Sequence, residues 1–136
     1  MNNLQNQKRI AERGGAAVKL LLIAVVLILI ANAGYNFIPT AYQGANFKQE
    51  METAIVQGVS LPSSYGTPTE VVREKLQTAA RVNEIPYDVL IDVKQNKNIV
   101  TARVYYAKKV PILPFGVYEY DYVFDHTATP GGFLAQ

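Results

Sequence analysis

The chain has 136 residues, a formal net charge of +2 and no cysteine. The absence of cysteine excludes disulfides, thiolate catalysis and cysteine-based metal or haem sites. Four basic residues and one acidic residue lie in the first 19 positions; removing them from the totals of 13 and 11 leaves nine basic and ten acidic residues. This balance near −1 argues against nucleic-acid binding, which needs a dense basic footprint.

The N-terminal segment, residues 1–15, is polar and is predicted to be a loosely ordered cytoplasmic tail. An uninterrupted apolar run follows from Leu20 to Ile30, with no polar face at any angle. With its flanks it covers residues 16–38, which is enough to cross a bilayer because a crossing takes about 20 residues. The predicted membrane-anchor residues are Leu20, Leu21, Leu22, Ile23, Val25, Val26, Leu27, Ile28, Leu29 and Ile30.

A cleaved secretory signal is the competing interpretation of this run. Ala31-Asn32-Ala33 has the small-x-small form that signal peptidase accepts. The apolar character continues to Phe37 and Ile38, which a signal does not need, and this favours an uncleaved anchor. In both cases the basic leader keeps the N terminus cytoplasmic and the remainder outside. The expected location is therefore the cell membrane, in single-pass topology.

Two short helices are predicted after the anchor. Pro39 is expected to end or kink the membrane helix, since it removes a backbone donor. Gly44–Gly58 then forms a separate amphipathic helix, and a helix from Pro68 follows. Thr67 is its predicted N-cap, with Glu70 completing a capping box. The apolar stripes are Phe47, Met51, Ala54 and Ile55 on the first helix and Val72, Leu76, Ala79 and Ala80 on the second.

Three strands are predicted from residue 87 onward, because the apolar period changes from helical to alternating. They cover residues 87–94, 99–108 and 117–125, with a tight turn at 95–98 and a proline-flanked connection at 111–114. Short links between strands favour an antiparallel meander with helices on one face. The predicted class is α+β: a transmembrane helix, two short helices and a three-stranded antiparallel sheet. The outer domain covers residues 39–126, and a frayed tail covers 127–136.

No catalytic, cofactor or metal site is predicted. Glu119, Asp121 and Asp125 form the one carboxylate cluster, but alternate strand residues lie about 7 Å apart, which is too wide to hold a metal without further ligands. The simpler interpretation is a solvated face that pairs with Arg103 and with Lys94 or Lys108. His126, the one histidine, has no nucleophile or ligand set beside it, and a hydrogen-bonded position at the strand end is expected.

Aromatic residues gather on one face of the third strand. Such a stripe is usually core that a helix covers, but any part left open is an interaction surface. The candidate interaction surface consists of Phe47, Met51 and Ile55 on the helix and Tyr118, Tyr120 and Tyr122 on the strand.

The pattern as a whole resembles a family of uncharacterised small single-pass bacterial membrane proteins. The resemblance rests on Glu12-Arg13-Gly14-Gly15, on Phe37-Ile38-Pro39-Thr40-Ala41-Tyr42, and on Tyr122-Val123-Phe124-Asp125-His126. That family is similar to pilins and pseudopilins, with a hydrophobic N-terminal helix before a small antiparallel sheet. Pilin maturation typically cuts after a glycine and leaves glutamate as the fifth mature residue. Here a cut after Gly14 or Gly15 would put Lys19 or Leu20 in that place.

These observations predict a non-enzymatic membrane protein that needs no cofactor. Its expected partners are the lipid bilayer and other membrane or envelope proteins, or itself, and nucleic acid is not among them. The two expected roles are an accessory or assembly subunit of a membrane complex and, alternatively, a pilin-like subunit of a filament.

Overall fold

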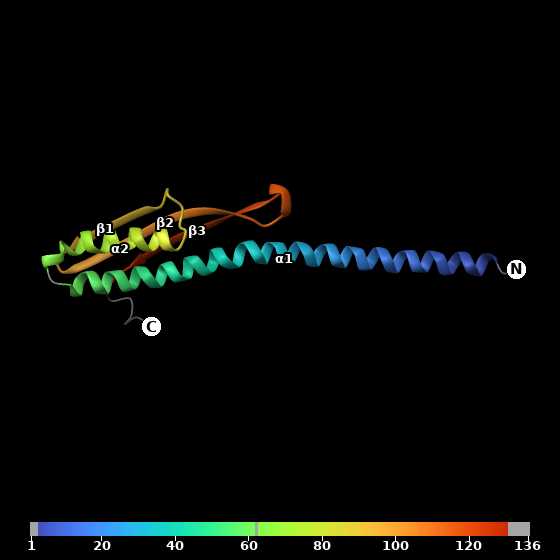
Figure 1. The fold of residues 1–136 in the computed structure, drawn as a ribbon, viewed down its shortest axis with the longest axis horizontal. Coiled ribbons are helices and arrows are strands. Elements are labelled where there is room, and N and C mark those ends of the chain that lie inside the picture. Colours follow the sequence, from blue (N-terminus) through green and yellow to red (C-terminus); the bar gives the residue numbers. More distant parts are fainter. Residues whose placement is uncertain (1–2, 62, 131–136) are drawn as a thin grey trace.

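A computed structural model describes the protein over residues 3–61 and 63–130. One helix, α1, runs along the whole molecule, and its second half lies with helix α2 against a three-stranded sheet (Figure 1). The elements in chain order are α1 (Asn3–Ser60), a 3-10 turn (Ser63–Tyr65), α2 (Pro68–Val82), β1 (Leu90–Asn96), β2 (Ile99–Pro111), a 3-10 turn (Pro114–Gly116) and β3 (Glu119–Ala128). The predicted α+β class with an antiparallel three-stranded sheet is confirmed.

Helix α1 continues through Pro39, where a break or kink was expected. Pro39 has no N–H to donate to the Tyr35 carbonyl four residues earlier. Two side chains on the adjoining turns donate to other carbonyls of the helix. The Asn36 amide donates to the Asn32 carbonyl at 2.9 Å, and the Thr40 hydroxyl donates to the Asn36 carbonyl at 3.3 Å. The prediction of a separate helix over residues 44–58 was wrong, because these residues form the last part of α1.

Both ends of the chain are more regular than expected. Helix α1 begins at Asn3, inside the segment predicted to be loosely ordered. Strand β3 includes Thr127 and Ala128, and Ala128 is buried, so the predicted frayed tail does not begin at residue 127. The remainder of that predicted tail, from residue 131, lies outside the described residues.

The sheet has the order β1-β2-β3, and its central strand is longer than its first neighbour. Strand β1 pairs with β2 only as far as Tyr105, whereas β3 pairs with β2 from Ala102 to Pro111. Residues 106–124 therefore leave the sheet as a two-stranded ribbon with its turn, which we call the hairpin arm. Pro111 pairs on one side only, opposite Glu119, as its missing N–H requires.

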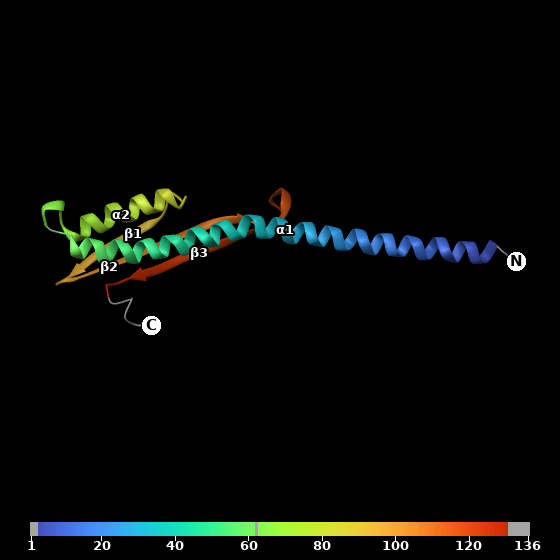
Figure 2. The same ribbon diagram turned by 60° about the horizontal axis from the view of Figure 1, so that its bottom comes forward.

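The core lies between one face of the sheet and the two helices, which cover that face side by side (Figure 2). Helix α2 begins as predicted, since the Thr67 N–H donates to Glu70 Oε2 at 3.1 Å and the Glu70 N–H donates to Thr67 Oγ1 at 3.4 Å. The predicted inward residues of α2 are buried: Val72, Leu76, Ala79 and Ala80. In the sheet the buried residues on the helix-covered face include Val93, Val100, Ala102, Val104, Tyr106 and Phe124, at alternating positions along the strands. Alternation thus gave the correct face of each strand.

Candidate membrane anchor and neighbouring surfaces

The first half of α1 is exposed and apolar on nearly every side. Among the described residues it is the one helix long and apolar enough to cross a membrane. Nine of the ten predicted anchor side chains are 45–70% exposed, and Leu29 alone is half-buried. Within the protein these side chains have almost no contacts, so the apolar surface that they present needs an apolar solvent or another helix.

In the second half of α1 the apolar stripe is buried in the protein core. The helix part of the predicted interaction surface is therefore wrong. Phe47, Met51 and Ile55 are completely buried and belong to the core. The Phe47 ring packs edge-on against Phe124 and Tyr106, with centroid distances of 5.6 and 6.3 Å. These three residues offer no surface to a partner, because the sheet and α2 already cover the stripe.

A row of rings joins α1 to strands β2 and β3 over the remaining length. Phe37 contacts Tyr120 and Tyr122 edge-on, at centroid distances of 6.0 and 6.2 Å. Tyr106 stacks on Phe124 at 5.0 Å, and burial raises the pKa of Tyr106 to about 12, which keeps its hydroxyl neutral. The row holds the arm against α1 from the core outward.

Gly44 permits the close approach of α1 to the arm. A Cβ built at this position would overlap the Tyr122 hydroxyl. The absence of a side chain therefore lets the tyrosine ring lie directly against the helix backbone. Tyr122 is half-buried as a result, whereas Tyr120 and Tyr118 remain exposed. Of the six residues predicted for the interaction surface, these three tyrosines still reach solvent.

The tip of the hairpin arm, residues 110–118, is an exposed apolar part of the outer domain, and of its residues only Tyr118 was in the predicted interaction surface. Phe115 is 100% exposed and Val117 is 72% exposed. The Asn32 amide donates to the Ile112 carbonyl at 3.0 Å, which holds the tip beside α1 just after the apolar run. A sequence signal was present: from Val110 to Tyr118 no residue carries a charge.

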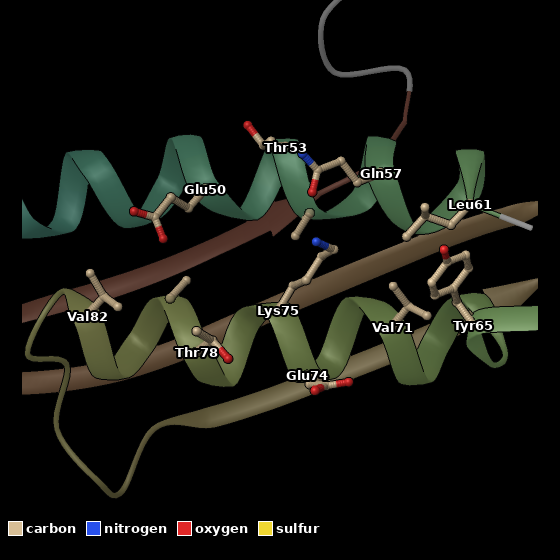
Figure 3. A pocket seen from close by; sticks show the side chains of 12 residues that line it. Glu50, Thr53, Gln57, Leu61, Tyr65, Val71, Glu74, Lys75, Thr78 and Val82 are labelled. Atoms are coloured by element: carbon tan, nitrogen blue, oxygen red, sulfur yellow. The ribbon is translucent and has the colours of Figure 1, made fainter.

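A groove separates α1 from α2 on the side away from the sheet (Figure 3). It has a volume of about 690 Å³ and ends at Leu61 and Tyr65. Its floor is apolar, and Lys75 reaches across it from α2 toward α1. The polar residues on its rim are Glu50, Thr53 and Gln57 from α1 and Glu74, Lys75 and Thr78 from α2.

The carboxylate cluster lies on the outer face of the sheet. Arg103 Nε donates to Asp125 Oδ1 at 3.0 Å and Nη2 donates to Oδ2 at 2.8 Å, the predicted pairing across two strands. These bonds hold the pKa of the Asp125 carboxyl below its usual range. Lys94 pairs instead with Asp92 of its own strand at 2.8 Å.

Lys108 also differs from its predicted role. Its ammonium donates to Gln43 Oε1 of α1 at 3.2 Å, so it ties the arm to the helix rather than to the carboxylates. Glu119 and Asp121 are exposed on the arm itself.

His126 lies on the inner face of β3, within the strand rather than at its end. Its Nε2 lies 3.7 Å from Glu52 Oε1 and, among the described residues, has no hydrogen-bond partner. Burial lowers the pKa of His126, and Lys48 lowers it further, against the opposing effect of Glu52. The expected hydrogen-bonded histidine is thus a neutral ring beside a carboxylate.

The described part of the chain places no three His, Cys, Asp or Glu side chains where they could hold a metal ion. No protein-family model, curated protein or solved structure matches this chain. The resemblance to small single-pass membrane proteins therefore stays a prediction from the sequence.

Proposed function

We propose that the protein is a non-enzymatic, single-pass membrane protein that acts by association with other membrane or envelope proteins, or with itself. In this proposal the N terminus is cytoplasmic, because Lys8, Arg9, Arg13 and Lys19 precede the apolar run. The domain from residue 39 onward lies outside the cytoplasmic membrane. The observation that carries the proposal is the continuity of α1, which supplies both the exposed apolar run and a large part of the outer core.

Two surfaces support association as the mode of action. Exposed aromatic side chains continue from Tyr118 to Tyr120 along the arm, and such patches mark contact sites. In the anchor, Ala24, Ala31 and Gly34 are small residues at which a second helix can approach closely. At Gly34 a Cβ would meet only Ile38 Cδ1 of the same helix, at 3.7 Å, so the surface there is open.

A pilin-like filament subunit is the second candidate, and one observation favours it. The outer half of α1 packs lengthwise on an antiparallel sheet while the apolar half stands free (Figure 1). This is the arrangement that the sequence resemblance implies, with a hydrophobic helix first and a small sheet after. A cut after Gly14 or Gly15 would leave no glutamate at the fifth mature position, and this is the point against it.

Native mass spectrometry after mild detergent extraction tests the proposal. We expect the protein to retain a partner or a second copy, and the variant Gly34→Leu to lose it if the anchor takes part. Val25→Leu is the matched control, because position 25 lies on the opposite face of the helix. A lone monomer of the parent protein in membrane-like conditions would contradict association.

The N terminus of the mature protein separates the candidates. An N terminus at or next to Met1 supports the anchored subunit, and one at Ala16 supports the pilin-like subunit. A start at Gly34 would contradict both and indicate a secreted protein.

A further inference from the structure

We infer that the tip of the hairpin arm, residues 110–118, lies in the outer interface of the bilayer and forms a second membrane contact beside α1. The inference rests on the proposed function, because it takes α1 to be the membrane span. Its occupant is the lipid of the outer leaflet, into which the tip places an aromatic and aliphatic surface.

The composition of the tip suits an interface. Nine consecutive residues between Lys109 and Glu119 carry no charge, and only the tyrosine hydroxyl is polar among their side chains. The exposed members are Phe115, Val117 and Tyr118. Aromatic rings collect at the boundary between headgroups and hydrocarbon, where an apolar body and a polar edge are both accommodated.

The backbone of the tip is also prepared for a medium with little water. Pro111 and Pro114 have no N–H to satisfy. The N–H groups of Ile112 and Leu113 both donate to the Tyr118 carbonyl, at 3.1 and 3.2 Å, and the Val117 N–H donates to the Pro114 carbonyl at 3.4 Å. For these donors the cost of leaving water is reduced.

Within the described residues, no contact of the Phe115 side chain compensates for the unfavourable backbone conformation of this residue. Its backbone has φ 62° and ψ 21°, a left-handed conformation that is unfavourable for a bulky residue. Its ring is fully exposed, so no contact within the described residues compensates for that conformation. A strained residue at a loop apex points to a contact outside the domain.

The position of the tip relative to the outer boundary of the hydrocarbon core follows from the length of α1 that crosses the bilayer. The Asn32–Ile112 hydrogen bond ties the tip to α1 at residue 32, and both ribbon views place the tip beside the helix there (Figures 1 and 2). A hydrocarbon core about 30 Å thick takes about 20 residues at about 1.5 Å each. Arg13 is charged, so a span that begins at Gly14 ends near residue 33.

A span that begins later places the tip deeper. If the core begins at Lys19, it ends near residue 38, and Asn32 lies inside the outer leaflet. Tilt shortens the rise along the membrane normal and moves Asn32 deeper still. In every arrangement in which α1 spans, the tip is at or below the outer boundary of the hydrocarbon. Lipid is therefore the medium that surrounds it.

Single tryptophan reporters test this inference, since the chain has no tryptophan of its own. Full-length Phe115→Trp is reconstituted in vesicles of ordinary phosphatidylcholine or of the same lipid brominated at shallow or deep acyl positions. We expect bromination to quench this tryptophan, with the larger loss for shallow bromine, and its emission to be blue-shifted. Tyr65→Trp is the matched control: Tyr65 is exposed but lies in the 3-10 turn that follows the C-terminal end of α1, so its fluorescence should not change.

A reporter in the anchor distinguishes the two possible failures. Ile28→Trp should be quenched most strongly by deep bromine; if it is not, α1 does not span and the proposed function itself fails. If Ile28→Trp is quenched but Phe115→Trp behaves like Tyr65→Trp, the tip is not in lipid and the inference alone is overturned. Val117→Trp repeats the measurement if Phe115→Trp does not fold, as judged by circular dichroism.

Discussion

The two halves of α1 differ in their apolar content and have opposite surroundings. Between Leu20 and Ile30 the apolar side chains cover the whole circumference, and almost all are exposed. Between Phe47 and Ile55 they form one stripe, and the stripe is completely buried. Both the number of apolar residues and their distribution around the helix therefore separate a helix suited to lipid from one suited to a protein core.

The comparison also explains why a single helix can serve both halves. Between Lys19 and Lys48 the chain has no Asp, Glu, His, Lys or Arg. Within this stretch Asn32 contacts the arm tip, Phe37 contacts the arm tyrosines, and Thr40 is buried. One side of the helix thus contacts the rest of the protein within the uncharged stretch that follows the apolar run.

The largest predicted difference in the free energy of unfolding comes from truncating one large apolar side chain in each half. Phe47→Ala should lower the free energy of unfolding of the outer domain by about 3–5 kcal/mol, because it leaves a cavity beside Phe124 and Tyr106. Leu27→Ala, in the other half, should change it by no more than about 0.5 kcal/mol. Urea titration of the full chain in mild detergent, followed by circular dichroism, measures both. Equal effects would show that the two halves do not differ in their contacts.

A charge in the first half gives the next effect. Ile28→Arg should prevent stable membrane integration, because an arginine at the helix centre costs about 2.5–3.5 kcal/mol on insertion scales. Carbonate extraction of membranes measures it, with Ile28→Leu as the control. Recovery of Ile28→Arg in the pellet at the level of the parent would contradict a transmembrane helix.

Glycines sharpen the comparison at a smaller scale. Gly44→Ala would bring a methyl group into the Tyr122 hydroxyl. Overpacking typically costs about 1–3 kcal/mol, and better helix propensity returns up to about 1 kcal/mol, so we expect a net loss near 1 kcal/mol. Gly34→Ala meets only ordinary contact distance and should not lower the domain's stability. Thermal melts of the two variants decide, and a stabilised Gly44→Ala would mean that the arm is not held against α1 there.

The smallest effect is a pH dependence confined to the second half. The pKa of His126 is lower in the folded protein than its ordinary value of 6.5, chiefly because of burial, while Lys48 and Glu52 face it from α1. The unfolded chain therefore binds the proton first as pH falls. Stability from this residue is complete above the unfolded pKa, declines as pH falls through 6.5 and levels off below the folded pKa.

His126→Gln should remove that component. Free energies of unfolding at pH 7.5 and pH 5.5 for both proteins measure it. The decline between the two pH values should be smaller in His126→Gln, and an unchanged decline would assign the pH dependence to the carboxylates instead.

Most of the fold was predictable because its signals are local. Thr67 and Glu70 define the start of α2, and alternation defined the inner faces of the strands. Pro39 was misinterpreted because the packing of the second half of α1 on the sheet, which favours a continuous helix, is not visible in a proline rule.

The candidate surfaces were harder to predict than the elements. Phe47, Met51 and Ile55 were correctly placed on one face, but their burial depends on how α2 and the sheet meet that face. The exposure of Phe115 depends on the arm reaching past β1, and this follows from the difference in strand lengths. Both are tertiary properties, which a period of 2 or 3.6 residues does not encode.

The unbroken helix has a mechanical consequence. From Ile38 to Ser60 it rises about 33 Å at about 1.5 Å per residue, so on the proposed span it acts as a stiff post that sets how far the groove between α1 and α2 stands above the bilayer. Such a post also transmits torsion. If a neighbouring helix packs against one side of the span, it fixes the rotation of α1 about its own axis. Because α1 is continuous, that rotation also fixes the direction in which the groove faces.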